Sequence, residues 1–412
     1  MAQVLRLNGL VRGYSGIRVE LVEALVRLFN AGSVPVVPQQ GSVGASGDLA
    51  PLAHMAATYM GHGEAWVRGE RQPAGEALAA VGEAPVVLRA KEGLALINGT
   101  EIMKAIGCVL WQRATNLSKA ADAIAALSLE SLFGSVRPFD DRLADLKNSE
   151  GQRRTSANVR ACLDGSEVLA SHTDCDRVQD PYSLRCVPQI HGAFKTALAH
   201  VSDVLAAEIN SVTDNPIIFP DTGEVLSAGL FHGQPISMVL DYLGIALCTL
   251  ANVSERRIEQ LVNPDLSHLP PFLTPEAGTS SGFMIAQVTA AALASENKVY
   301  AHPASVDTVP TSANQEDHVS MGVTAARKAR TILDNTESVL AIELLAGAQA
   351  REFHKDLRAG PGPEAAWRVL RERVPALGPD RYMHTDIEAA REIVASGRLV
   401  EAVEAAVGAL QA

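Results

Sequence analysis

The amino-acid sequence predicts a mainly α-helical protein built as a bundle of long helices. Apolar residues recur every three or four positions over long stretches, which is the period of one face of an α-helix. Several of these stretches are much longer than the average globular helix of about a dozen residues. Segments rich in Pro, Gly, Asn and Asp separate them, at 33–51, 133–141, 213–235 and 263–281. Long helices bury their apolar faces best against one another, so a helix bundle is expected.

The helices are expected in the following order. Ser15 can cap a first helix that ends at Gly32, with Leu21, Leu25 and Leu28 on its apolar face. Longer patterns follow at about 100–132, 188–212, 234–262, 282–300 and 317–345, and a shorter one closes the chain near 387–410. Short strands are expected only at 86–88 and at 217–226, where residues 221–223 form a hairpin turn. We expect a single mainly α domain over residues 1–412.

Composition and charge exclude several classes of protein. The chain has 412 residues, 47% of them hydrophobic, and a net charge of −12, which argues against nucleic-acid or anionic-membrane partners. The N-terminus lacks the features of a signal peptide, and no apolar run is expected to span a bilayer. The histidines and cysteines show no metal-binding spacing, and the scattered cysteines indicate reduced thiols in the cytoplasm. The five cysteines are Cys108, Cys162, Cys175, Cys186 and Cys248.

The segment 41–54, GSVGASGDLAPLAH, is the most informative part of the sequence. At its centre, Ala45-Ser46-Gly47 places a serine between two of the smallest residues. Because Gly47 has no Cβ, its nitrogen can approach the Ala45 carbonyl carbon. If that ring closes and water is lost, the Ser46 side chain becomes an exocyclic methylene, a strong electrophile that ordinary side chains do not provide.

Three other interpretations of this segment are weaker. A nucleophile elbow requires Gly-x-Ser-x-Gly, and Asp48 occupies the position of the second glycine. A phosphate-binding P-loop requires a lysine that is absent, and the glycine spacing does not match a dinucleotide fingerprint. A flexible surface loop is the usual fate of Gly/Ser-rich runs, but the residues that follow are too particular for a linker.

Segment 41–54 resembles the active-site loop of the aromatic amino acid ammonia-lyases, which form a methylidene-imidazolone (MIO) group from Ala-Ser-Gly. The resemblance implies an MIO electrophile made autocatalytically from Ala45, Ser46 and Gly47, with no external cofactor and no metal. It also implies the long-helix bundle of that family, of the fumarase/aspartase-like type with small β hairpins. The similarity covers nearly the whole chain, from the motif at 13–16 to the C-terminal helices.

The resemblance implies catalytic roles for Asn98 and Glu316. Asn98 matches the asparagine that hydrogen-bonds near the MIO ring and the substrate amine, although an Asn before a helix is also a common N-cap. Glu316 matches a residue that projects into the pocket, where a glutamate favours a substrate with a basic, polar ring. Its alternative role, shared with Asp317, is to stabilise a helix N-terminus that begins in the 312–318 cluster.

Four further residues are implicated in binding the substrate or in catalysis. Arg185 resembles the substrate carboxylate anchor, which suits the two parallel hydrogen bonds of a guanidinium, while a surface salt bridge is the ordinary alternative. Gln179 and Tyr182 are implied to line the same pocket, Tyr182 as a catalytic residue, although Tyr182 could be a core tyrosine. Phe231 resembles a phenylalanine packed beside the electrophile. Without the resemblance, an apolar aromatic residue would be expected in the hydrophobic core. The family usually has Asn where this chain has Leu230.

His54, His232 and His318 lie inside family motifs and are expected to be structural or to support the residues that contact the substrate. The resemblance is strongest to the members that act on histidine, in the segments 91–100, 211–216 and 315–317. It implies conversion of L-histidine to trans-urocanate and ammonia by a homotetramer whose sites draw residues from several subunits. It also implies that the family's N-terminal segment, with its catalytic tyrosine loop, is missing here, so that this chain alone has little activity.

Alternative functions remain open at this point. A phenylalanine or tyrosine ammonia-lyase or an aminomutase of the same family would share the loop. A non-catalytic relic would keep the bundle without turnover. A hydrolase that uses Ser46 as its nucleophile is a weaker possibility.

Overall fold

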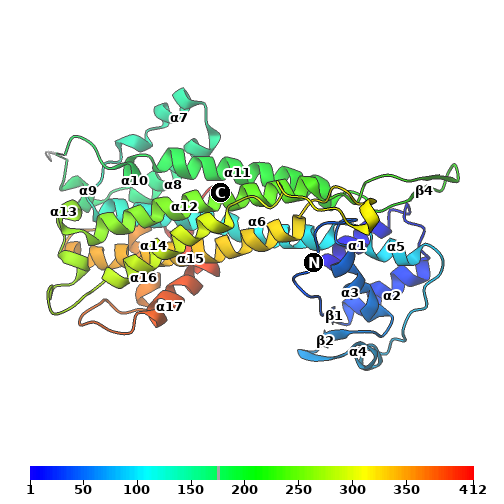
Figure 1. Ribbon diagram of the computed structural model, residues 1–412. Coiled ribbons are helices and arrows are strands. Elements are labelled where there is room, and N and C mark those ends of the chain that lie inside the picture. Colours follow the sequence, from blue (N-terminus) through cyan, green and yellow to red (C-terminus); the bar gives the residue numbers. More distant parts are fainter. Residues whose placement is uncertain (174–176) are drawn as a thin grey trace. The chain divides into compact units, whose positions relative to one another are not determined.

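The computed structural model describes residues 1–173 and 177–412 and is mainly helical, which confirms the predicted fold class (Figure 1). Its contacts divide the chain into two compact units. The first unit comprises Met1–Leu110, Val201–Tyr242 and Pro303–Ala329, and the second comprises Trp111–His200, Leu243–His302 and Arg330–Ala412. The single domain expected from the sequence stays a prediction.

The five patterns predicted between residues 100 and 345 each correspond to one helix. These helices are α6 (Glu101–Ser131), α11 (Val187–Ile209), α12 (Gln234–Val262), α14 (Met284–Tyr300) and α15 (Gly322–Arg351). Their bounds agree with the periodicity to within a few residues except for α15. That helix begins at Gly322, later than expected, because Met321 just before it has a left-handed φ of +55°.

The first predicted helix exists, but its start was wrong. Helix α2 (Val19–Asn30) has Arg18 at its N-cap, and Ser15 lies buried before it. The apolar face is as expected, since Leu21, Leu25 and Leu28 are all buried. Gly32 follows the helix with a φ of +74°, a left-handed conformation that ends helices readily.

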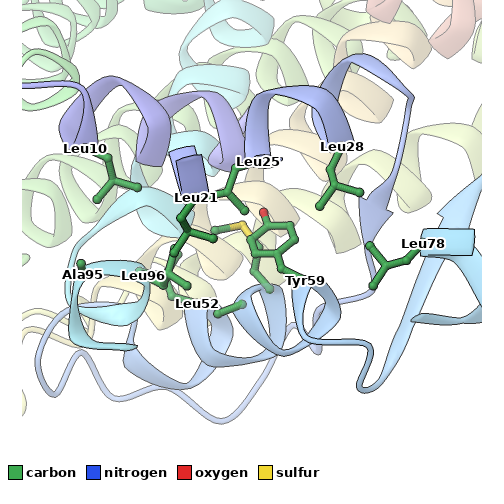
Figure 2. Packing of buried hydrophobic residues seen from close by; sticks show 11 residues of the cluster. Leu10, Leu21, Leu25, Leu28, Leu52, Tyr59, Leu78, Ala95 and Leu96 are labelled. Carbon is green, nitrogen blue, oxygen red and sulfur yellow. The ribbon is translucent and has the colours of Figure 1, made fainter. Parts of the chain in front are cut away.

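The first unit has an apolar core made by short helices. Leucines of α1 (Ala2–Leu10) and α2 meet Leu52 and Tyr59 of α3 (Leu49–Tyr59), as Figure 2 shows. Leu78 of α4 (Ala74–Ala80) and Leu96 of α5 (Glu92–Ile97) belong to the same cluster. This core holds α3 and α5 in contact, and each of these helices adjoins a loop with candidate site residues.

The β structure agrees with the prediction in one place and differs from it in two. Strands β4 (Ile217–Phe219) and β5 (Glu224–Leu226) pair antiparallel, which confirms the hairpin. Residues 86–88 are not a strand, because their backbone contact is a single bond from Val86 N to the carbonyl of Tyr59 in a helix. An unpredicted antiparallel sheet joins β1 (Val34–Pro35), β2 (Glu64–Val67) and β3 (Glu70–Pro73) in that order.

The second unit contains parts of the long helices together with several shorter helices. The expected single helix at 387–410 is wrong, because Gly397, with a φ of +89°, separates two helices, α17 and α18. The shorter helices of the second unit are α7 (Asp141–Lys147), α8 (Glu150–Leu163), α9 (Glu167–Ala170), α10 (Tyr182–Arg185), α13 (Pro264–Ser267), α16 (Pro361–Arg371), α17 (His384–Ala395) and α18 (Arg398–Val407).

Helix α12 is long and apolar enough to cross a membrane, which corrects the expectation that no segment has that length and composition. However, 61% of its most apolar 18-residue window is buried inside the protein. The core helix of a globular protein passes the same test, so this evidence for a membrane span is weak.

Candidate active site around Ser46 and Glu316

The Ala45-Ser46-Gly47 segment forms a tight turn in the first unit. The Gly47 N–H donates to the Gly44 carbonyl at 3.2 Å, and both Ser46 and Gly47 have positive φ, at +48° and +76°. A Cβ on Gly47 would lie 2.2 Å from the carbonyl oxygen of Gly99 and 2.7 Å from that of Phe231. Position 47 therefore requires glycine both for its backbone angle and for the close approach of two other chain segments.

Asp48 attaches this turn to the start of helix α6. Its Oδ2 accepts hydrogen bonds from Ile102 N at 2.8 Å and from Met103 N at 3.0 Å, and its own N–H donates to the Gly99 carbonyl at 2.6 Å. Asp48 is fully buried, and this burial raises the pKa of its carboxyl to about 7. Asp48 had no predicted role, although its position directly after the tripeptide was an available signal.

Ser46 and Glu316 lie 270 positions apart in the sequence and are brought into direct contact. The Ser46 hydroxyl donates to Glu316 Oε1 at 2.8 Å, and the Thr311 hydroxyl donates to Glu316 Oε2 at 2.8 Å. The hydrogen bond from Ser46 is the largest cause that lowers the pKa of Glu316, with Thr311 and Ser312 adding to it against partial burial. Glu316 is therefore a carboxylate at neutral pH.

The alternative role of Glu316 and Asp317 as helix-capping acids is wrong. Helix α15 begins only at Gly322, and the backbone of Glu316 instead bridges to Thr311. Both side-chain oxygens of Glu316 accept hydroxyl hydrogen bonds and none from a helix N-terminus.

Asn98 lies next to the same turn, after the end of helix α5. It is not the N-cap of α6, which begins at Glu101, so that alternative is wrong. Its Nδ2 donates to the Asn215 carbonyl at 2.8 Å, while its buried Oδ1 has no hydrogen-bond partner among the described residues. A buried acceptor without a partner is costly, and such an atom is a natural site for a ligand N–H.

Phe231 is a half-buried loop residue, not a member of the core. Its carbonyl faces Gly47, as described above, and the neighbouring Leu230 is 47% exposed. The ring of His232 stacks on that of His318 with centroids 5.8 Å apart, and His232 Nε2 lies 3.2 Å from the His318 carbonyl oxygen. His54 is exposed on helix α3.

Gln179, Tyr182 and Arg185 belong to the second unit. Tyr182 is 68% exposed, so it is not a core tyrosine, and Gln179 is also exposed. The Arg185 guanidinium carbon lies 4.5 Å from the Tyr182 ring centroid, and its Nε donates to the Asp180 carbonyl at 2.9 Å. Within the described residues, Arg185 makes these two contacts and no salt bridge with a carboxylate. Tyr182 and Gln179 are thus exposed and Arg185 is half-buried against the Tyr182 ring, and the roles of all three stay predictions.

The chain's similarity to known proteins is extensive. The aromatic amino acid lyase family model matches residues 1–372. A histidine ammonia-lyase of Stigmatella aurantiaca is 52% identical over 403 residues, which cover 98% of this chain and 79% of that protein.

Solved structures share the fold. Histidine ammonia-lyase from Trypanosoma cruzi superposes with a TM-score of 0.91 at 42% identity, over 98% of this chain and 78% of that one. A tyrosine aminomutase from Streptomyces globisporus superposes with a TM-score of 0.93 at 37% identity, over 100% of this chain and 81% of that one. By these matches in sequence and structure, the chain belongs to the aromatic amino acid lyase family.

Proposed function

We propose that this chain eliminates ammonia from L-histidine to give trans-urocanate. The observation that carries the proposal is the contact between Ser46, at the centre of the Ala45-Ser46-Gly47 turn, and the ionised carboxylate of Glu316. Membership of the aromatic amino acid lyase family and 52% identity to a histidine ammonia-lyase support the reaction class and the substrate.

Ala45, Ser46 and Gly47 hold the electrophile as an MIO ring. Three features support this assignment: the turn that folds Gly47 N back onto Gly44, the absence of space for a Cβ at Gly47, and the unpartnered Oδ1 of Asn98 beside the turn. An MIO ring supplies an electrophile that can capture a substrate, which the twenty ordinary side chains do not. No external cofactor and no metal are part of the proposal.

Glu316 selects the substrate. A carboxylate in a partly buried site is stable only with hydrogen-bond donors around it. The N–H of a histidine imidazole is such a donor, whereas a phenylalanine ring would leave the carboxylate desolvated and unpaired. Glu316 therefore favours histidine over the phenylalanine and tyrosine substrates of the alternative family members.

Asn98 and Phe231 complete the site in the first unit. The free Oδ1 of Asn98 accepts a hydrogen bond from the substrate ammonium group, and its bond to the Asn215 carbonyl fixes the amide orientation. The Phe231 ring excludes water from the reacting atoms, since its backbone already borders Gly47.

Tyr182, Gln179 and Arg185 supply the remaining groups in the assembled enzyme, which we propose to be a homotetramer. The guanidinium of Arg185 holds the substrate carboxylate, because its planar fork donates two parallel hydrogen bonds. The Tyr182 hydroxyl takes part in proton transfer, and Gln179 lines the pocket. The exposure of Gln179 and Tyr182 on a single chain supports completion of each site by several subunits.

The hydrolase alternative is less well supported. A serine nucleophile is usually activated by a base that removes its proton and is in turn oriented by a third group, most often histidine with a carboxylate. Ser46 donates instead to Glu316, whose other oxygen is bound by a threonine. We also propose the cytoplasm as the compartment, supported by free thiols at the four described cysteines, while Cys175 lies outside the described residues.

Two measurements on the full chain test the proposed function. Intact mass spectrometry is expected to show a mass lower than the encoded chain by two waters, and the Ser46→Ala variant is expected to lack this loss. Absorbance assays are expected to show urocanate from histidine, with much slower product formation from phenylalanine and tyrosine. An unshifted mass would support the relic alternative, and faster turnover of phenylalanine would overturn the choice of substrate.

A further inference from the structure

Each carboxylate oxygen of Glu316 accepts a 2.8 Å hydrogen bond from a different hydroxyl group, and the side chain of Ser312 adds a further contact that lowers its pKa. Oε1 accepts from Ser46 and Oε2 accepts from Thr311, each at 2.8 Å. Hydrogen bonds from two sides fix both the position and the rotation of a carboxylate. The two donors differ in one respect, because Ser46 is part of the tripeptide that cyclises and Thr311 is not.

Formation of the proposed ring removes one of these donors. A bond forms between Gly47 N and the Ala45 carbonyl carbon, and the Ala45 oxygen leaves as water with the Gly47 and Ser46 amide hydrogens, which creates a C=N bond. Ser46 then loses its Cα hydrogen and its Cβ hydroxyl as a second water, which creates the exocyclic C=C bond. Both steps are dehydrations without oxidation or reduction. Afterwards Oε1 of Glu316 has lost the Ser46 donor, while Oε2 keeps Thr311.

Thr311 is itself held firmly by the backbone. Its N–H donates to the Glu316 carbonyl at 2.9 Å, and the Glu316 N–H donates to the Thr311 carbonyl at 3.2 Å. The three residues that follow Thr311, Ser312 to Asn314, all have positive φ, from +50° to +68°. Such backbone angles persist only where the surrounding structure fixes them, so the hydroxyl of Thr311 has a defined place relative to Glu316.

We propose that Thr311 is a positioning residue that holds Oε2 of Glu316, so that Oε1, once released by Ser46, faces the substrate ring. This inference rests on the proposed function and extends it to the origin of substrate selection. The side chains of Thr311 and Ser312 also lower the pKa of Glu316 separately from Ser46. Ring formation thus frees Oε1 of Glu316 for the substrate at the same time as it creates the electrophile.

The test uses L-histidine binding, measured by calorimetry, so that it does not depend on turnover. The Ser46→Ala chain serves as the reference, because it leaves Oε1 of Glu316 free and cannot form the ring. Thr311→Val removes the donor while keeping the side-chain shape, and Thr311→Ser keeps the donor as the matched control. We expect Thr311→Val to weaken histidine binding about tenfold and Thr311→Ser to change it by less than about twofold, since a hydrogen bond to a charged group is lost only in the first.

A Glu316→Gln background shows whether Thr311 acts through Glu316. There we expect Thr311→Val to have almost no further effect, because coupled residues are non-additive. Equal binding by the Val and Ser variants would overturn this inference and leave the proposed function standing. A full tenfold loss that persists in the Glu316→Gln background would do the same. Failure of the Ser46→Ala chain to bind histidine at all would instead overturn the proposed substrate, and with it this inference.

Discussion

At the scale of a single residue, Asp48 combines burial with an ionisable charge. Its Oδ2 satisfies two backbone N–H groups at the start of α6, which would otherwise lack partners inside the helix. Its Oδ1 is buried, with no hydrogen-bond partner in the part of the chain that the structure describes. The carboxyl thus anchors the Ala45-Ser46-Gly47 turn, and its ionisation in this position opposes folding.

We predict that Asp48 makes the protein less stable as the pH rises. Burial raises the pKa of Asp48 to about 7 in the folded chain, against 3.8 as the ordinary value. The folded chain therefore retains a proton that the unfolded chain has lost between these values. The resulting stability is complete at acid pH and disappears as the pH rises through 7. Between pH 5 and pH 8 this effect amounts to about 2–3 kcal/mol.

Urea unfolding of the parent and of Asp48→Asn at pH 5 and pH 8 measures this effect. The amide oxygen of asparagine can accept the same two backbone hydrogen bonds but does not titrate in this range. We expect the variant to gain stability relative to the parent at the higher pH. Parallel pH profiles for the two proteins would show that Asp48 does not titrate in this window.

At the scale of elements, buried ion pairs connect the helices of the second unit. Arg257 of α12 and Glu343 of α15 are both fully buried, with Nε–Oε1 and Nη2–Oε2 distances of 2.6 and 2.9 Å. Arg257 Nη1 also lies 3.5 Å from the carbonyl of Ser183 in α10, the helix that carries Tyr182 and Arg185. Charged side chains therefore fix the place of α10 within this unit.

A second buried cluster continues from Arg257. Its Nη1 lies 3.4 Å from His191 Nε2, and His191 Nδ1 lies 2.7 Å from Asp122 Oδ1. Burial lowers the pKa of His191, so the imidazole is neutral, with its proton on Nδ1 and its lone pair toward the guanidinium. Lys195 pairs with Asp122 at 3.1 Å and balances its charge.

We predict that Arg257→Met destabilises the protein strongly, by about 3–5 kcal/mol, because Glu343 is left as an unpaired buried charge. Replacing both partners, as in Arg257→Met with Glu343→Leu, is expected to recover much of this loss, since no charge remains buried. Denaturant unfolding of the two variants measures the difference. A double variant as unstable as the single one would show that the pair acts chiefly through packing or through Ser183.

At the scale of the whole molecule, helix α14 presents apolar side chains to solvent on one face. Ile285, Val288 and Val299 are 60%, 52% and 69% exposed, and their spacing places them on the same side of the helix. A row of exposed apolar residues on one helix face is typical of a protein–protein interface. It supports the proposed homotetramer.

We predict that Ile285→Glu combined with Val288→Glu prevents assembly, because the added carboxylates would have to lose water at the interface. Leu146→Glu on α7 is the matched control, since Leu146 is 86% exposed and stands on a different helix of the same unit. Light scattering after size-exclusion chromatography measures the mass. A smaller particle is expected for the double variant only, and an unchanged mass would remove α14 from the interface.

Helix positions and the hairpin were largely predictable, because periodicity and turn residues are local properties of the sequence. The errors came where a local signal was misread or where a distant contact replaced it. Ser15 looks like a helix cap but is buried, and Gly397 divides a pattern that reads as one helix. At the start of α6, Asp48 supplies the hydrogen bonds that the alternative role of Asn98, as an N-cap, would have provided.

The sequence by itself determined the helical class, the small-residue tripeptide at 45–47 and the candidate polar residues, since these depend on residue type and nearby spacing. Only the tertiary structure decided that Ser46 meets Glu316, that Asn98 keeps a free acceptor, and that Thr311 holds the second carboxylate oxygen. The physical reason is that a hydrogen bond joins groups only within about 3 Å, and this closeness depends on the path of the whole chain.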